Sequence, residues 1–320
     1  MTTRNPLIHR LSLAALVLLF VSGPAMAQTA MTQTVTAQNN KSVPLQFDHV
    51  SICGANLDTL RQAFTDAGLT PDPGGAHANG ITQMASVGFD DSSYIELIAP
   101  IKPGAAEGSP WAKFMSEDAV ICDWAAGVSG LQQELDRLKK AGIPVKAPEP
   151  GSRKRPDGMS IEWNTADIGS STSGATLPFL IEDVTPHAWR AQTSASVQGS
   201  PLSAVGSVVL GVSNLDAAIA LFHKAYGWTE PLVETQKDFG KLAYFPGEPV
   251  ILAAPAGGGW LSDRLAKYGE SPVAILLDTR DFAAATKKYK LNGGKTWFGQ
   301  KIAWFDAGKL KGVRLGVIGQ

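Results

Sequence analysis

Two strand-like segments each carry one side chain that could do chemistry. Residues 47–53 read FDHVSIC and contain His49, and residues 94–99 read YIELIA and contain Glu96. In a strand, each of these side chains shares its face with the residues two positions away. Glu96 interrupts an otherwise apolar run. An unpaired buried carboxylate is costly, so we expect Glu96 to be protonated, hydrogen-bonded, paired with a cation or bound to a metal ion.

The elements that must position these residues recur along the chain. In the first copy, the strand over 47–53 is followed by a helix that Asn56 caps and Gly68 ends, and then by strands around 81–89 and 94–99, with room for one more. A shift of 158 residues places Asn56, Leu57, Asp58 and Phe64 on Asn214, Leu215, Asp216 and Phe222, and shifts of 74 and 86 place Leu57, Gly68 and Glu96 on Leu131, Gly142 and Glu182. A fainter fourth copy starts at Pro272. The pattern predicts four βαβββ units in two pairs.

Four segments of the sequence resemble a known family. They read FDHVSI at 47–52, YIELI at 94–98, RPDG at 155–158 and LPFLI at 177–181. Together they resemble the vicinal oxygen chelate superfamily and, within it, the glyoxalase-like domain proteins. The resemblance implies an α+β fold in which four βαβββ units form two cup-shaped mixed-sheet domains. These are a glyoxalase-like domain over residues 45–190 and a second, degenerate domain over residues 203–320, where the signature residues are missing.

The resemblance also implies a divalent metal ion inside the first cup, held by residues on the first and last strands of the units. The repeat alignment places Asp123 at the position of His49 and Glu182 at that of Glu96. The expected ligands are therefore His49, Glu96, Asp123 and Glu182. One imidazole with carboxylates suits Mn, Fe, Ni, Zn or Mg better than a thiophilic ion. In the alternative, His49 is a core histidine hydrogen-bonded to Glu96 and no ion is present.

Further residues could act around this centre. His77 lies in a glycine-rich turn segment and could be a general acid or base, or a solvated loop histidine. Glu182 could serve as the catalytic base instead of as a ligand. The guanidinium of Arg155 could orient a substrate carboxylate, and Trp163 could wall the pocket or fill the core.

The second pair of units lacks these donors. The alignment places Ser207 at the position of His49 and Ile251 at that of Glu96, and the fourth unit offers Ala274. We expect no metal of this kind in the second cup, which could serve as a lid, a docking surface or a separate binding pocket.

A metal ion in an open cup can bind two adjacent substrate oxygens and stabilise the enolate that forms when a proton beside a carbonyl is removed. The first hypothesis is therefore a metal-dependent lyase or isomerase acting on a small oxygenated molecule. The alternative is a non-catalytic protein that binds or sequesters a small molecule. Fold alone does not decide between them.

Composition limits the partners. The chain has 320 residues, 44% of them hydrophobic, and a formal net charge of -1 without a long basic run. Nothing in this balance attracts a nucleic acid. Since the chain carries four units, we expect a monomer or a homodimer.

The first residues indicate export. Arg4 and Arg10 precede an apolar stretch that Gly23 and Pro24 break, and small residues around Ala27 suit a signal peptidase. We expect a signal peptide over 1–27, a flexible leader over 28–44 and a periplasmic or secreted protein with no membrane span. Export permits a disulfide between Cys53 and Cys122, but strict strand alternation puts them on opposite faces and favours two buried thiols.

Overall fold

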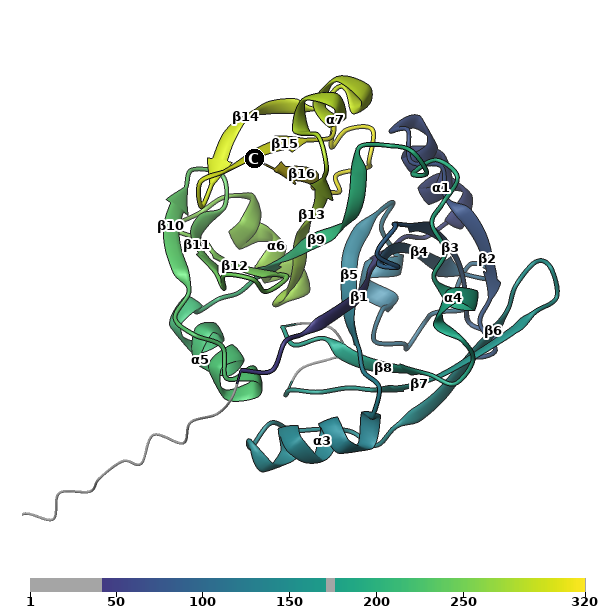
Figure 1. The fold of residues 1–320 in the computed structure, drawn as a ribbon. Helices are drawn as coiled ribbons and strands as arrows, with labels where there is room; N and C mark the ends of the chain where they lie inside the picture. Colours follow the sequence, from purple (N-terminus) through teal and green to yellow (C-terminus); the bar gives the residue numbers. More distant parts are fainter. Residues whose placement is uncertain (1–41, 171–175, 320) are drawn as a thin grey trace, which may run out of the picture. The chain divides into compact units, whose positions relative to one another are not determined.

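The computed structural model describes residues 42–170 and 176–319, which form two mixed sheets of eight strands each. The strand order is β2-β3-β4-β1-β5-β8-β7-β6 in the first sheet and β10-β11-β12-β9-β13-β16-β15-β14 in the second. Each sheet curves back on itself into a cup, as Figure 1 shows. The predicted signal peptide and most of the predicted leader lie outside the described residues.

The first sheet holds two βαβββ units. The first unit comprises β1 (Gln46–Cys53), α1 (Leu57–Asp66), β2 (Asp72–Ala76), β3 (Thr82–Gly88) and β4 (Tyr94–Pro100). The second comprises β5 (Val120–Gly127), α3 (Leu131–Lys140), β6 (Glu149–Lys154), β7 (Ser160–Ala166) and β8 (Phe179–Asp183). Two short helices, α2 (Ala112–Met115) and α4 (His187–Arg190), follow β4 and β8.

The second sheet repeats this order twice. The third unit of the chain comprises β9 (Leu202–Gly211), α5 (Leu215–Tyr226), β10 (Leu232–Gln236), β11 (Gly240–Tyr244) and β12 (Val250–Ala254). After α6 (Trp260–Tyr268), the fourth comprises β13 (Ser271–Thr279), α7 (Phe282–Tyr289), β14 (Asn292–Trp297), β15 (Gln300–Trp304) and β16 (Leu315–Gly319). The predicted α+β fold of four βαβββ units in two cups is confirmed.

Local sequence explains where the recurring helices start and which face they bury. The Asn56 side chain accepts a hydrogen bond from Thr59 N at the start of α1, and Asn214 caps α5 in the same way. Such caps satisfy backbone donors that the first helical turn leaves free. The buried face of α1 packs into the same core as Val50, Ile52, Ile95 and Leu97. The alternate residues of β1 and β4 therefore face the inside of the cup.

Two bulges interrupt this alternation where β1 pairs with β5. Asp48 is an extra residue on β1 between the pairs Phe47–Ala126 and His49–Ala125. Cys122 is an extra residue on β5 between the pairs Ser51–Asp123 and Ile52–Ile121. A bulge leaves one residue without a partner and redirects the side chains around it.

The expectation of two buried thiols is wrong, because the bulge at Cys122 was not predicted. Cys53 and Cys122 form a disulfide whose Cα atoms are 5.8 Å apart. The disulfide lies in a buried cluster with Ile98, Phe114 and Tyr268.

The second cup holds an apolar cluster beside a cavity of about 510 Å³ that Ser207 and Ile251 line. Ile251 pairs with Val209 as Glu96 pairs with Ser51, so the predicted correspondence of Ile251 with Glu96 agrees with the strand register. Both Ile251 and Val209 belong to a buried cluster that includes Phe239 and Trp297.

Helix α6 links the second half to the first. Its Arg264 donates a hydrogen bond to the Ile121 carbonyl of β5, 2.6 Å away, and Tyr268 stacks on Phe114. At the other end, Val43 N donates to the Tyr226 carbonyl, so the last residues of the predicted leader are bound to α5. Among the described residues, no helix is long and apolar enough to cross a membrane.

Replacing both cysteines by alanine is expected to lower the free energy of unfolding. The bond closes a loop between residues 69 positions apart, and a cross-link of this kind typically contributes about 2–5 kcal/mol. Urea unfolding of wild type and of the double variant, each with and without reductant, measures the difference. Reductant should destabilise only the wild type, and equal stability of the two proteins would contradict the assignment.

Candidate functional site

Two histidines face the two oxygens of one carboxylate inside the first cup. His49 Nε2 lies 3.9 Å from Glu96 Oε2, and His77 Nε2 lies 3.7 Å from Glu96 Oε1. His49 comes from β1 and Glu96 from the parallel strand β4, while His77 directly follows β2. His49 and Glu96 are buried, at 4% and 8% exposure. The structure thus brings together three of the predicted site residues, which we call the central triad.

The other ring nitrogen of each histidine is already engaged. His49 Nδ1 is 2.5 Å from Asp48 Oδ1, and His77 Nδ1 is 2.8 Å from Thr82 Oγ1. The imidazole of His49 also stacks on Tyr94 with ring centroids 4.7 Å apart. Partners of this kind fix ring orientation and leave Nε2 directed at Glu96.

Electrostatics favour a neutral His77. Burial lowers the pKa of His77, although the nearby Glu96 carboxylate opposes this shift. A neutral imidazole offers a lone pair, which suits a metal ligand or a proton acceptor better than the general acid that the sequence also allowed.

Asp48 belongs to a buried ion-pair network around Arg190. Arg190 Nη1 and Nη2 each donate to one oxygen of Asp48 at 2.8 Å, and Arg190 Nε donates to Asp183 Oδ1 at 2.7 Å. Burial alone would raise the pKa of the Asp48 carboxyl, but the charge and hydrogen bonds of Arg190 and His49 hold that pKa well below its usual range. Asp48 is therefore an anion that can accept a hydrogen bond from His49 Nδ1–H.

One further group in this network has the composition of a metal site. Asp48, Asp183 and His187 each offer an atom within 4.8 Å of the others. The Arg190 guanidinium donates to both carboxylates and lies 3.3 Å from His187 Nδ1. Since a guanidinium already compensates these charges, we assign the group to the ion-pair network.

The structure does not bring Asp123 to the central triad. Asp123 Oδ2 accepts a hydrogen bond from Trp111 Nε1 at 3.1 Å, and Oδ1 accepts one from Trp124 N. Burial raises the pKa of Asp123 to about 8, against the lowering effect of these two bonds. The carboxyl is therefore protonated at neutral pH. The hydrogen bond that Glu96 does receive comes from Ser51 Oγ, at 2.6 Å.

Glu182 is also separate from the triad, because the alignment of the repeats is displaced by one residue in β8. Phe179 packs edge-on against His49. Ile181 and Asp183 are two and four positions later in the strand, so they lie on the same face of β8 as Phe179. Asp183 shares that face and bonds Arg190. Glu182 faces the other way, and its carboxylate accepts from Leu131 N at the start of α3.

Of the predicted substrate-binding residues, Trp163 contacts the triad, whereas Arg155 lines a cavity that no triad residue lines. The ring of Trp163 packs edge-on to His77 with centroids 6.1 Å apart. Arg155 lines a cavity of about 410 Å³ and donates to the Trp189 carbonyl. The same cavity is lined by Ser86, Arg153 and Arg190.

Sequence reasoning missed Asp48 and Arg190 as site residues. Asp48 had a local signal, since a carboxylate next to a candidate ligand histidine is a frequent orienting partner. Arg190 follows the last strand of the first sheet, and its distance from Asp48 along the chain leaves no such signal.

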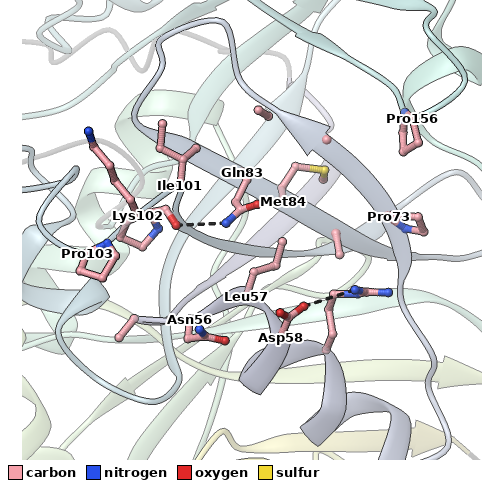
Figure 2. Close-up of a pocket in the computed structure, with 16 residues that line it drawn as sticks. Asn56, Leu57, Asp58, Pro73, Gln83, Met84, Ile101, Lys102, Pro103 and Pro156 are labelled. Atoms are coloured by element: carbon pink, nitrogen blue, oxygen red, sulfur yellow. Dashed lines mark hydrogen bonds and ion pairs between the residues drawn. The ribbon is translucent and has the colours of Figure 1, made fainter.

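A separate cavity of about 330 Å³ lies beside the start of α1 (Figure 2). Asp58 and Arg61 pair with each other there, and Gln83 donates to the Pro100 carbonyl. The residues of the central triad do not line this cavity, and unlike the cavity of about 410 Å³ it contains neither Arg153 nor Arg155.

By chemical type, the donors of the central triad suit a divalent metal ion, although among the described residues only the donor atoms of Asp48, Asp183 and His187 all lie within 4.8 Å of one another. Each imidazole has one nitrogen engaged and the other directed at Glu96. Two imidazoles and one carboxylate form a donor set that Fe, Mn, Ni and Zn accept. Among the described residues, no lysine or arginine nitrogen lies within 4.0 Å of a Glu96 oxygen, so no side-chain cation already takes this place.

Comparison with known proteins identifies one family and several similar folds. The model of the glyoxalase-like domain family matches residues 47–226. A comparison with curated protein sequences gave no match. A hypothetical protein from Staphylococcus aureus is 12% identical with a TM-score of 0.57, over 85% of this chain and 98% of that one.

Two enzymes share this fold. A variant of 4-hydroxymandelate synthase from Streptomyces coelicolor is 13% identical with a TM-score of 0.58, over 86% of this chain and 92% of that one. A fusion of a xylose isomerase-like TIM barrel with 4-hydroxyphenylpyruvate dioxygenase is 12% identical with a TM-score of 0.50, over 87% of this chain and 49% of that one. At these identities the likeness establishes the fold alone.

Replacing Asp123 by asparagine is expected to remove a pH dependence of stability. The pKa of about 8 in the folded protein exceeds that of an aspartate in an unfolded chain, about 4. Folding therefore takes up a proton between these values, and the wild type loses stability as the pH rises from about 5 to about 8. As the pH rises over this range, the free energy of unfolding of the wild type should fall relative to that of the variant, by at most about 1.4 kcal/mol per pH unit.

Urea unfolding of both proteins in the presence of a chelator, at about pH 5 and about pH 8, measures this shift. A stability difference that is the same at both pH values would contradict a protonated Asp123.

Proposed function

Because the chain belongs to the glyoxalase-like domain family of the vicinal oxygen chelate superfamily, we propose that it is a metal-dependent lyase or isomerase that acts through the enolate of a small oxygenated substrate. The proposal rests on one observation. The free nitrogens of His49 and His77 face the two oxygens of Glu96 inside the first cup.

The ligands we propose are His49, His77 and Glu96. His49 and Glu96 keep the role that the sequence suggested, and His77 takes the place of Asp123 and Glu182. The bound ion would act as a Lewis acid that polarises substrate oxygens next to an acidic C–H bond. The metal remains one of Mn, Fe, Ni, Zn or Mg by donor chemistry, with imidazole favouring the transition metals.

The chain's own residues would prepare this site. The Asp48 carboxylate accepts a hydrogen bond from His49 Nδ1–H and so keeps Nε2 free. Ser51 Oγ donates to Glu96 and holds that carboxylate in place. Tyr94 and Phe179 pack on the ring of His49 and exclude water from it.

We further propose that the protein works outside the reducing cytosol. The signal-peptide pattern over residues 1–27 supports this location. So does the Cys53–Cys122 disulfide, because such bonds persist mainly in oxidising compartments.

Changing His49 or His77 to alanine, or Glu96 to glutamine, is expected to abolish stoichiometric metal binding. Each change removes one of three ligands, and elemental analysis of the purified proteins measures the loss. His187→Gln is the matched control, because it changes a histidine of the Arg190 network and should leave the metal content at one ion per chain. Metal lost from His187→Gln but kept by His77→Ala would move the site to that network.

A milder variant tests how the His77 ring is held. Thr82→Val removes the hydroxyl that contacts His77 Nδ1. Loss of such an orienting partner typically lowers metal affinity by about 10- to 100-fold.

The metal-loaded protein is expected to exchange the acidic C–H hydrogen of its substrate in heavy water. Proton NMR of a panel of small oxo and hydroxy compounds follows the loss of the C–H signal. Glu96→Gln should lower the exchange rate by about 100-fold or more, and Ser207→Ala, in the second cup, should leave it unchanged. A protein that contains no metal and binds a panel compound without exchange would support a binding protein instead.

A further inference from the structure

A buried guanidinium of the first cup lacks an acidic partner. Arg153, on β6, is 6% exposed. Its Nη1 donates to the Gly74 carbonyl at 2.5 Å and its Nη2 to the Arg190 carbonyl at 3.3 Å. Within residues 42–170 and 176–319, no carboxylate oxygen lies within 4.0 Å of its nitrogens. A guanidinium has five N–H donors, so these two bonds leave others free.

Arg190, in the same cup, is a buried arginine whose charge is compensated by carboxylates. It is equally buried, but it bonds the carboxylates of Asp48 and Asp183. Leaving a buried charge unpaired costs free energy, which a structure tolerates where a ligand later supplies the opposite charge. Burial lowers the pKa of Arg153, but a guanidinium stays protonated at neutral pH.

Arg153 is a neighbour of His77 and also lines a cavity. It forms an isolated antiparallel bridge with His77 and lines the cavity of about 410 Å³. Ser86 also lines this cavity, and it stands directly opposite Glu96 in the pairing of β3 with β4. The cavity therefore reaches β3, the strand that pairs with the one carrying Glu96, although no residue of the triad lines it.

A second guanidinium is close by. Arg155 lines the same cavity, where its Nη2 pairs with Asp157 at 2.8 Å. Asp157 is half exposed, so its charge is screened by water. The buried positive charge at the inner end of the cavity belongs to Arg153.

We propose that Arg153 binds a carboxylate of the ligand in this cavity, with Arg155 contributing at its outer side. The planar guanidinium matches a carboxylate in two parallel hydrogen bonds. As an assignment of substrate class this rests on the proposed function: the substrate is a small acid whose carboxylate lies on Arg153 and whose reacting oxygens face the triad. Binding of the carboxylate itself does not require the metal.

The test uses metal-free protein, with succinate as the probe and the neutral succinamide as its uncharged counterpart. Calorimetric titration at constant ionic strength should show binding of succinate but not of succinamide. Arg153→Met should weaken succinate binding by about 10- to 100-fold, the range expected for charged hydrogen bonds. Lys154→Met is the matched control, since this exposed neighbour on β6 should leave binding unchanged.

A second variant and several possible results decide whether the proposal holds. If circular dichroism shows that Arg153→Met does not fold, Arg153→Lys keeps the charge but loses the planar fork, and should still weaken succinate binding. Wild-type protein that does not bind succinate, variants that bind it as well as wild type, or tighter binding of inorganic phosphate than of succinate would overturn the proposal. Succinate binding that depends on Arg153 in a protein unable to hold metal would overturn the proposed enzyme and leave the carboxylate site standing.

Discussion

The ion pair between Asp48 and Arg190 is the interaction on which the first cup depends. It joins β1 to the short helix after β8, and through Asp183 and Tyr94 it reaches β8 and β4 as well. Two charges taken out of water must find each other in good geometry, and removing one partner of such a pair typically costs about 3–5 kcal/mol. Here both Asp48 oxygens accept from Arg190, and one of them also contacts His49. The interaction that closes the cup therefore also sets the orientation of its first histidine.

The two cups show how one framework can hold different interiors. Their strand orders are the same, and the pairs Ser51–Glu96 and Val209–Ile251 occupy equivalent positions. In the first cup the pair is polar and lies next to two histidines, whereas in the second it belongs to an apolar cluster with Trp297. Strand pairing is a backbone property, so it tolerates this exchange of side chains. Function follows the side chains that fill the cup.

Most of the fold could be predicted from sequence because its signals are local and repeated. Asn56 and Asn214 start equivalent helices, and the apolar alternation of β1 and β4 directs His49 and Glu96 into one cavity. Strict alternation could not reveal the two bulges. The bulge in β5 turns the Cys122 side chain towards Cys53, and the bulge in β1 turns the Asp48 side chain towards the ring of His49.

Other site residues depend on contacts between distant segments. His77 follows an edge strand, and its meeting with Glu96 depends on how β2 and β3 curve over β4. Glu182 and Asp183 are adjacent acids, and only the pairing of Asp183 with Trp163 shows which one faces inward. Arg153 and Arg190 are brought together by the closing of the sheet, for which a single sequence has no periodic signal.

Through helix α6, the second half of the chain supports the structure of the first. Its Arg264 and Tyr268 hold the base of the first cup, next to the buried disulfide. A shortened chain ending after the first sheet would leave Phe114 and its apolar neighbours open to water, so the half that carries the central triad is poorly suited to fold as an isolated fragment. A duplicated module that has lost its own donors can thus be retained as a foundation for the copy that kept them.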